Sequence, residues 1–207
     1  MYSRQMLSVI EGRVLGCLLE KERTTPDQYP MSLNALVLAC NQSTARDPAM
    51  VLGSHDVEAA ITMLKSIGVA RLVHPSHGRS VTRYRQIADQ QNEWDRAQSA
   101  LIAVLLLRGP QTSAELKSRT ERLHEFRSIE VMAAVLRDLA AADEPVVVQL
   151  ERAPGQKEVR WQQLFADEAE PVARSHSIAP VGGLAERVDD LETRIVRLER
   201  AIADLLD

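Results

Sequence analysis

Aromatic residues are scarce in this sequence, at 3% of the chain, and cysteine occurs only twice in 207 residues. Few aromatics leave an aliphatic core and argue against an RNA binder that stacks bases on aromatic platforms. Cys17 and Cys40 lie in apolar helical runs without CxxC spacing. We interpret both as buried small hydrophobic residues, and we expect neither a disulfide framework nor a cysteine metal site.

Long hydrophobic runs are also missing. The longest, residues 100–107, is far too short to span a membrane, and the first residues lack the basic and apolar regions of a signal peptide. We therefore expect a cytoplasmic protein without membrane contact. His74 and His77 have no obvious third ligand, so we expect no metal and no other cofactor.

Catalytic signatures are absent as well. The sequence has no Gly-rich phosphate loop, no nucleophile elbow and no HExxH motif. Thr24, Thr25 and Asp27 are explained by capping and turn formation. We expect no catalytic residues, and hence a protein that is not an enzyme.

Charge is modest and unevenly distributed. The net charge is −4, which is not typical of a general nucleic-acid binder. Residues 1–88 hold ten Lys/Arg and seven Asp/Glu (+3), residues 89–165 ten and twelve (−2), and residues 166–207 five and ten (−5). A phosphate-binding surface is therefore expected in the first of these segments.

An internal repeat is the strongest signal in the sequence. Residues 57–67 form an apolar stripe at helical spacing, and residues 69–73 and 79–87 predict two strands joined by a turn. The helix pattern recurs 72 residues later and the hairpin 77 residues later. Tyr84 and Trp161 then hold equivalent positions, and we interpret both as core anchors.

A helix followed by a two-stranded wing is the second half of a winged helix-turn-helix module. We therefore predict a mainly α protein with small β-hairpins (α+β), built from tandem winged-helix modules. The expected helices are 8–22, 33–41, 54–67, 94–108, 112–119 and one that begins at 128. Capping boxes, Ser8 with Glu11 and Thr112 with Glu115, open the first and the fifth of these helices, and Ser54 is the expected cap of the third. The predicted organisation is a first module at 1–88, a second at 89–165, a linker at 166–183 and a coiled-coil helix at 184–207.

The C-terminal segment carries hydrophobic residues in alternating steps of four and three. With Val188 at heptad position a, β-branched residues occupy a and leucines occupy d, which favours a parallel two-stranded coil and hence a homodimer. The alternative is an amphipathic helix that folds back on its own chain. The predicted interface consists of Leu184, Val188, Leu191, Ile195, Leu198, Ile202 and Leu205.

Several long motifs resemble those of one family. The first set comprises Leu19-Glu20, Thr24-Thr25-Pro26-Asp27-x-Tyr29-Pro30, Asn34, Ala39-Cys40-Asn41-Gln42 and Arg46-Asp47-Pro48. The second comprises Arg79-x-Val81-Thr82-Arg83-Tyr84, Leu105-Leu106-Leu107-Arg108-Gly109-x-Gln111-Thr112 and Arg152-x-Pro154-Gly155. Together with the C-terminal heptads, they resemble the YceH family over nearly the whole chain.

The resemblance implies a bacterial cytoplasmic protein with two winged-helix modules, and it implies no known activity. The sequence departs from the family at Ser43, because family members tend to have a lysine after the Asn-Gln pair. This departure weakens the argument that the loop after residue 41 binds phosphate.

Candidate DNA contacts lie on three elements of the first module. The helix 54–67 would enter the major groove. Its predicted outer positions include only one basic residue beside nearby acids; they are His55, Glu58, Thr62, Lys65 and Ser66. The hairpin 69–87 carries Arg71, Arg79, Arg83 and Arg85, which could clamp phosphate, pair with an acidic protein or form a solvated face.

The third group of candidates is the polar set Asn41, Gln42 and Arg46. Asn and Gln side chains can read adenine, so a contact surface for base edges or a partner is one interpretation. The structural alternative is an ion pair between Arg46 and Asp47 that orders the loop.

Two functions remain open from the sequence. The first is a dimeric DNA-binding protein, for example a transcriptional regulator that reads an inverted repeat. The second is a protein-interaction adaptor that uses its winged helices without binding DNA. The acidic second module and the weakly basic helix 54–67 favour the adaptor.

Overall fold

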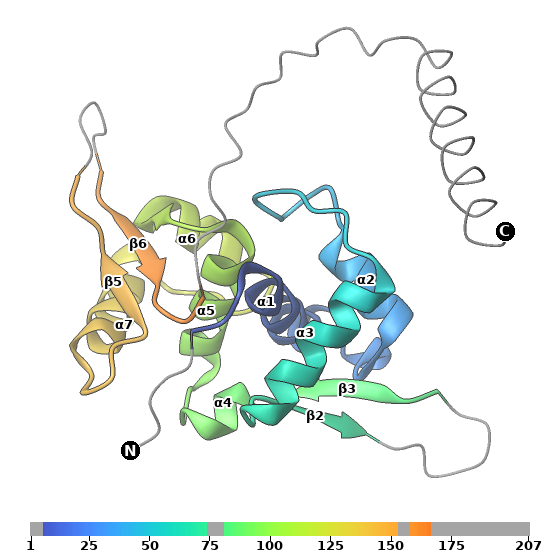
Figure 1. Cartoon of the computed structure of the whole chain (residues 1–207). Coiled ribbons are helices and arrows are strands. Elements are labelled where there is room, and N and C mark those ends of the chain that lie inside the picture. The colour runs from blue at the N-terminus through green and yellow to red at the C-terminus, as the bar shows by residue number, and fades with distance from the viewer. Residues whose placement is uncertain (1–5, 74–80, 153–157, 167–207) are drawn as a thin grey trace, which may run out of the picture. The chain divides into compact units, whose positions relative to one another are not determined.

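The computed structural model describes residues 6–73, 81–152 and 158–166 (Figure 1). Arg79, the turn at residues 74–78, and the predicted linker and coiled-coil residues after 166 lie outside the described residues. The chain divides into one compact unit over residues 1–170 and a second over residues 171–207. The description below concerns the first unit.

The first half of this unit combines helices with a small sheet. Its strands run antiparallel in the order β1-β3-β2, with Met31 opposite Tyr84 and Tyr84 opposite Leu72. The elements are α1 (Val9–Thr24), a 3-10 turn (Pro26–Gln28), β1 (Met31–Ser32), α2 (Leu33–Cys40), α3 (Ser54–Ser66), β2 (Ala70–Val73) and β3 (Arg83–Gln86).

The second half repeats the same order after a short helix. Its sheet has the equivalent order β4-β6-β5, also antiparallel. The elements are α4 (Ala88–Gln91), α5 (Arg96–Arg108), β4 (Gln111–Thr112), α6 (Ser113–Thr120), α7 (Ile129–Ala141), β5 (Val147–Gln149) and β6 (Arg160–Gln163). The mixed α+β class is therefore confirmed.

Side-chain caps explain where most helices begin. Ser8 and Thr112 form the predicted capping boxes of α1 and α6, and the Ser32 hydroxyl accepts from the Ala35 N–H to start α2. The helix α3 differs slightly from prediction. Gly53, rather than Ser54, occupies its cap, and the Asp56 carboxylate accepts the Gly53 N–H at 2.8 Å.

The helical part of the repeat is offset by 75 residues rather than the predicted 72. Val57 and Ile61 of α3 are fully buried, as are Met132 and Leu136 of α7, whereas Ile129 is 40% exposed. The prediction was wrong because a shift of three residues still superposes one apolar helical stripe on another. The hairpin offset of 77 agrees with the strand registers.

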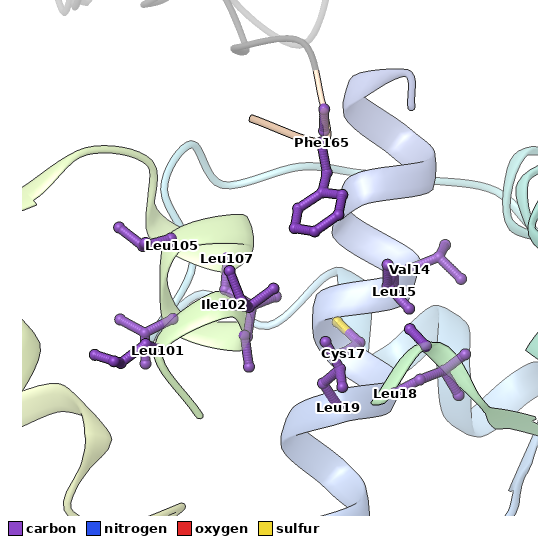
Figure 2. Close-up of a cluster of buried hydrophobic side chains, with 14 of the residues drawn as sticks. Val14, Leu15, Cys17, Leu18, Leu19, Leu101, Ile102, Leu105, Leu107 and Phe165 are labelled. Atoms are coloured by element: carbon purple, nitrogen blue, oxygen red, sulfur yellow. The ribbon is translucent and has the colours of Figure 1, made fainter. Parts of the chain in front are cut away.

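The two halves share one core, which forms where α1 packs against α5 (Figure 2). Gly16 allows α1 to approach α5 closely, and Gly12 leaves room for Ala166, which follows β6. A Cβ atom added at Gly16 would lie 3.0 Å from Cγ and Cδ2 of Leu107, and one at Gly12 would lie 2.7 Å from Cβ of Ala166. The N-terminus adds a further connection, since the Leu7 N–H donates to the Phe165 carbonyl at 2.7 Å.

Candidate functional site

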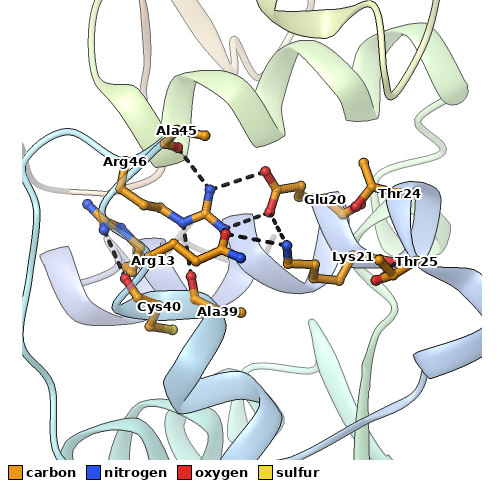
Figure 3. Close-up of polar contacts among 10 residues, drawn as sticks. Arg13, Glu20, Lys21, Thr24, Thr25, Ala39, Cys40, Ala45 and Arg46 are labelled. Carbon is orange, nitrogen blue, oxygen red and sulfur yellow. Dashed lines mark hydrogen bonds and ion pairs between the residues drawn. The ribbon is translucent and has the colours of Figure 1, made fainter.

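A buried ion pair joins α1 to the loop between α2 and α3 (Figure 3). Arg46 binds the Glu20 carboxylate with both terminal nitrogens, at 3.1 Å to Oε1 and 2.6 Å to Oε2. The Arg46 side chain has no exposed surface and that of Glu20 is 12% exposed. Such a bidentate contact fixes both the position and the orientation of the guanidinium.

Arg46 also holds the backbone around it. Its Nε donates to the Ala39 carbonyl at 3.0 Å, and a terminal nitrogen donates to the amide oxygen of Gln42 at 2.8 Å. The predicted pair with Asp47 is therefore wrong: Arg46 turns inward to Glu20, while Asp47 is exposed. The Asp47 N–H instead donates to the Leu107 carbonyl at 2.9 Å, which ties the loop to α5.

A second arginine lies in the same cluster. Arg13 is 2% exposed and donates to the carbonyls of Cys40 at 3.2 Å and Pro48 at 2.6 Å. Its Nε has no hydrogen-bond partner among the described residues. Among the described residues, the hydrogen bonds of this guanidinium thus all go to neutral carbonyl groups.

Burial and neighbouring charges shift the pKa values of these groups in different directions. Burial raises the pKa of Glu20, but the hydrogen bonds and charge of Arg46 outweigh it, so the pKa lies below its ordinary value. Burial lowers the pKa of Arg46, but the bond to Glu20 leaves it raised. The pKa of Arg13 is lowered, first by burial.

The side chain of Asn41 stabilises the same loop. Its side-chain amide donates to the Leu52 carbonyl and accepts the Leu52 N–H, both at 2.8 Å. Gln42 accepts from both Arg46 and Lys21. Asn41, Gln42 and Arg46, which were candidates for reading bases, therefore use their polar groups to build the loop.

The hairpin arginines have mixed surroundings. Arg83 is exposed but donates to the Pro30 carbonyl at 2.8 Å, and its repeat equivalent Arg160 donates to the Pro110 carbonyl at 2.9 Å. A contact found in both halves indicates a structural role for Arg83. Arg85 is half-buried and lies 3.5 Å from Glu22, whereas Arg71, directly opposite Arg85, is exposed.

The outer face of α3 is short of positive charge. His55, Glu58 and Thr62 are exposed as expected, while Lys65 is half-buried. Two large apolar side chains are exposed on the segments before α3: Leu38 of α2 is 72% exposed and Val51, just before α3, is 97% exposed. The bonds between Asn41 and Leu52 hold Val51 near the end of α2, one helical turn beyond Leu38.

We name one set of exposed residues, taken from α2, from Val51 and from α3, the α2–α3 surface. It consists of Asn34, Leu38, Val51, His55, Glu58, Ala59 and Thr62, all of which are exposed. Exposed apolar side chains framed by polar ones are typical of an interaction surface. Sequence periodicity predicted the outer positions of α3 but gave no signal that Leu38 and Val51 are exposed.

The described residues contain neither a cluster of metal-binding side chains nor a helix that could span a membrane. Its histidine, cysteine and acidic side chains form no group of three that could hold a metal ion. None of its helices combines the length and the apolar character needed to cross a bilayer.

Comparison with known proteins identifies relatives along nearly the whole chain. A family model described as "Protein of unknown function, DUF480" matches residues 7–156. A UPF0502 protein of Shewanella sp. (strain ANA-3) is 42% identical over 97% of this chain and 94% of its own length. Another, from Enterobacter sp. (strain 638), is 39% identical over 98% and 97%. A third, from Geobacter sulfurreducens, is 41% identical over 97% and 90%.

Proposed function

This chain belongs to the UPF0502 (DUF480) family, which includes YceH, and we propose that it is a non-enzymatic adaptor that binds another protein through its α2–α3 surface. The observation that carries the proposal is the exposure of two large aliphatic side chains, Leu38 on α2 and Val51 just before α3. Burying two large aliphatic side chains favours association by about 1.5–3 kcal/mol each.

The proposal includes the winged-helix assignment of both halves. The order helix, strand, helix, helix, strand, strand supports it, as does the sheet order β1-β3-β2 and its copy β4-β6-β5. In this assignment α3 is the helix that would enter a DNA groove. Its exposed Glu58 and the neighbouring Asp56 would instead repel phosphate.

Internal contacts of the polar candidates support a protein partner over DNA. Asn41, Gln42 and Arg46 are bonded within the loop, and Arg85 is paired with Glu22. Releasing these groups toward nucleic acid would break the contacts that hold the surface in shape. The adaptor requires no such rearrangement.

DNA binding through the hairpin remains a second candidate function. Arg71 is exposed and the guanidinium of Arg83 also reaches the surface. Two such cations on adjoining strands could contact a phosphate backbone. This candidate predicts sequence-independent binding that weakens steeply with salt.

Homodimerisation through residues 184–207 is part of the proposal. The supporting observation is the heptad pattern itself, in which β-branched residues and leucines alternate. A parallel dimer would present two α2–α3 surfaces, so that a partner with two binding sites would gain affinity by avidity.

Site-specific photocrosslinking tests the adaptor function. A benzophenone amino acid is placed at Val51, and at Glu121 as an exposed control position on the second half. We expect one defined protein to crosslink from position 51 and not from position 121, and Leu38→Asp to abolish that product. Equal crosslinking from both positions, or indifference to Leu38→Asp, would contradict the proposal.

A further inference from the structure

The segment that carries the α2–α3 surface exposes acidic side chains but no lysine or arginine. Residues 33–66 form α2, the loop after it and α3, and all of them are described by the structure. Both cations of this segment are shielded, because the Arg46 side chain has no exposed surface and Lys65 is half-buried. Its three acids are exposed; they are Asp47, Asp56 and Glu58. A partner therefore meets negative charge together with exposed aliphatic groups.

One of these acids adjoins the apolar part of the surface. The Asp56 Oδ2 accepts the Gly53 N–H at 2.8 Å, and Gly53 follows Val51 by two residues. Two residues of chain span at most about 7 Å, so the carboxylate lies close to the exposed Val51. Asp47 lies apart from this arrangement, because its N–H donates to the Leu107 carbonyl of α5.

The carboxylates on α3 remain available to a partner. Among the described residues, no lysine or arginine forms an ion pair with Asp56 or Glu58. Lys65 is separated from Glu58 by two helical turns, which is about 10 Å along the axis of α3. A carboxylate has about four acceptor positions, so Asp56 can accept further donors beside the Gly53 N–H.

The loop before α3 is fixed before any partner arrives. Asn41 makes two hydrogen bonds to Leu52, both at 2.8 Å, and Arg13 donates to the Pro48 carbonyl at 2.6 Å. Both anchors lie within three residues of Val51. A preformed surface binds without the entropic cost of ordering a loop.

We infer that the partner of the α2–α3 surface is a protein segment that combines aliphatic side chains with lysine or arginine. Such long basic side chains have an apolar stem and a charged head. The stem of one basic residue covers Val51 while its head pairs with Asp56, and a second cation pairs with Glu58. An aliphatic side chain of the same segment covers Leu38. This inference rests on the proposed adaptor function and names the chemistry of its partner.

A synthetic peptide serves as the probe of this chemistry. A fluorescein-labelled amphipathic peptide of leucine and lysine is titrated with the full chain, and fluorescence anisotropy reports binding. The matched peptide has glutamate in place of lysine. We expect only the lysine peptide to bind, and salt to weaken its binding because exposed ion pairs are screened.

Neutral variants test the two carboxylates. Asp56→Asn with Glu58→Gln should weaken binding of the lysine peptide about three- to tenfold, because each exposed ion pair contributes up to about fivefold. Asparagine keeps an oxygen that accepts the Gly53 N–H, and circular dichroism checks the fold. Glu121→Gln with Glu125→Gln is the matched control, since both residues are exposed on the second half and the net charge changes equally. Equal binding by the two variants, or equal affinity for both peptides, would overturn the inference.

Photocrosslinking from position 51 separates this inference from the adaptor function itself. Loss of the crosslinked protein in Asp56→Asn with Glu58→Gln, but not in the control variant, is the expected result. A defined product that both variants retain would leave the adaptor function standing and refute the cationic partner. The absence of any product specific to position 51 would refute the adaptor function, and this inference with it.

Discussion

Replacement of Arg46 by methionine tests whether the buried ion pair holds the loop after α2. Removing one partner of a buried pair costs about 3–5 kcal/mol, because the other charge stays buried and uncompensated. Here Glu20 keeps Lys21 at 3.4 Å and a 12% exposed side chain. We therefore expect a loss at the lower end of that range, about 3 kcal/mol.

Urea unfolding followed by circular dichroism measures this loss, with Asp47→Ala as the matched control. Asp47 adjoins Arg46 in sequence but is exposed, so its replacement should change the free energy of unfolding by less than about 0.5 kcal/mol. Adding Glu20→Met to Arg46→Met should recover part of the loss, because the uncompensated carboxylate is removed.

The reasoning fails under either of two results. A loss below about 1 kcal/mol for Arg46→Met would place the pair among weak surface contacts. An equal loss of stability for Asp47→Ala would instead support the ion pair between Arg46 and Asp47 that the sequence suggested.

Three further outcomes are expected. Gly16→Val should lower the free energy of unfolding by about 1–3 kcal/mol in urea titrations, because its side chain would overpack the contact between α1 and α5; a neutral result would mean that the helices separate freely. The lowered pKa of Glu20 adds stability above its unfolded pKa of about 4.3, and this stability is lost as pH falls through the folded value. Unfolding measured from pH 7 to 3 should therefore show a shallower decline for Glu20→Gln, and parallel curves would contradict the assignment. Ile195→Lys with Leu198→Lys should yield a monomer in analytical ultracentrifugation, whereas a persistent dimer would place the interface elsewhere.

Local signals in the sequence predicted much of the fold. The capping boxes at Ser8 and Thr112 and the apolar stripes of the helices located most elements to within a few residues. The strands β1 and β4 were missed because each has two residues, which is too short for alternation to be recognised. They form because they pair with β3 and β6, strands of hairpins that are distant in sequence.

Interactions over long sequence distances account for what could not be predicted at the site. Arg46 has an acidic neighbour in Asp47, yet its partner is Glu20, which precedes it by 26 residues. The packing of Gly16 on α5 likewise depends on how α1 is placed. Residue type identified the polar set around Asn41, but only its hydrogen bonds distinguish a loop scaffold from a base-reading surface.

Fluorescence anisotropy of the full chain with a mixed-sequence DNA duplex tests the central claim most directly. The titration begins at about 50 mM salt, where even non-specific phosphate contacts are strong. The adaptor function predicts no binding there, and Arg71→Glu with Arg83→Glu should leave the signal unchanged. Binding that falls linearly with the logarithm of salt concentration, and that the double variant weakens on every sequence, would contradict the account and assign the hairpin to DNA.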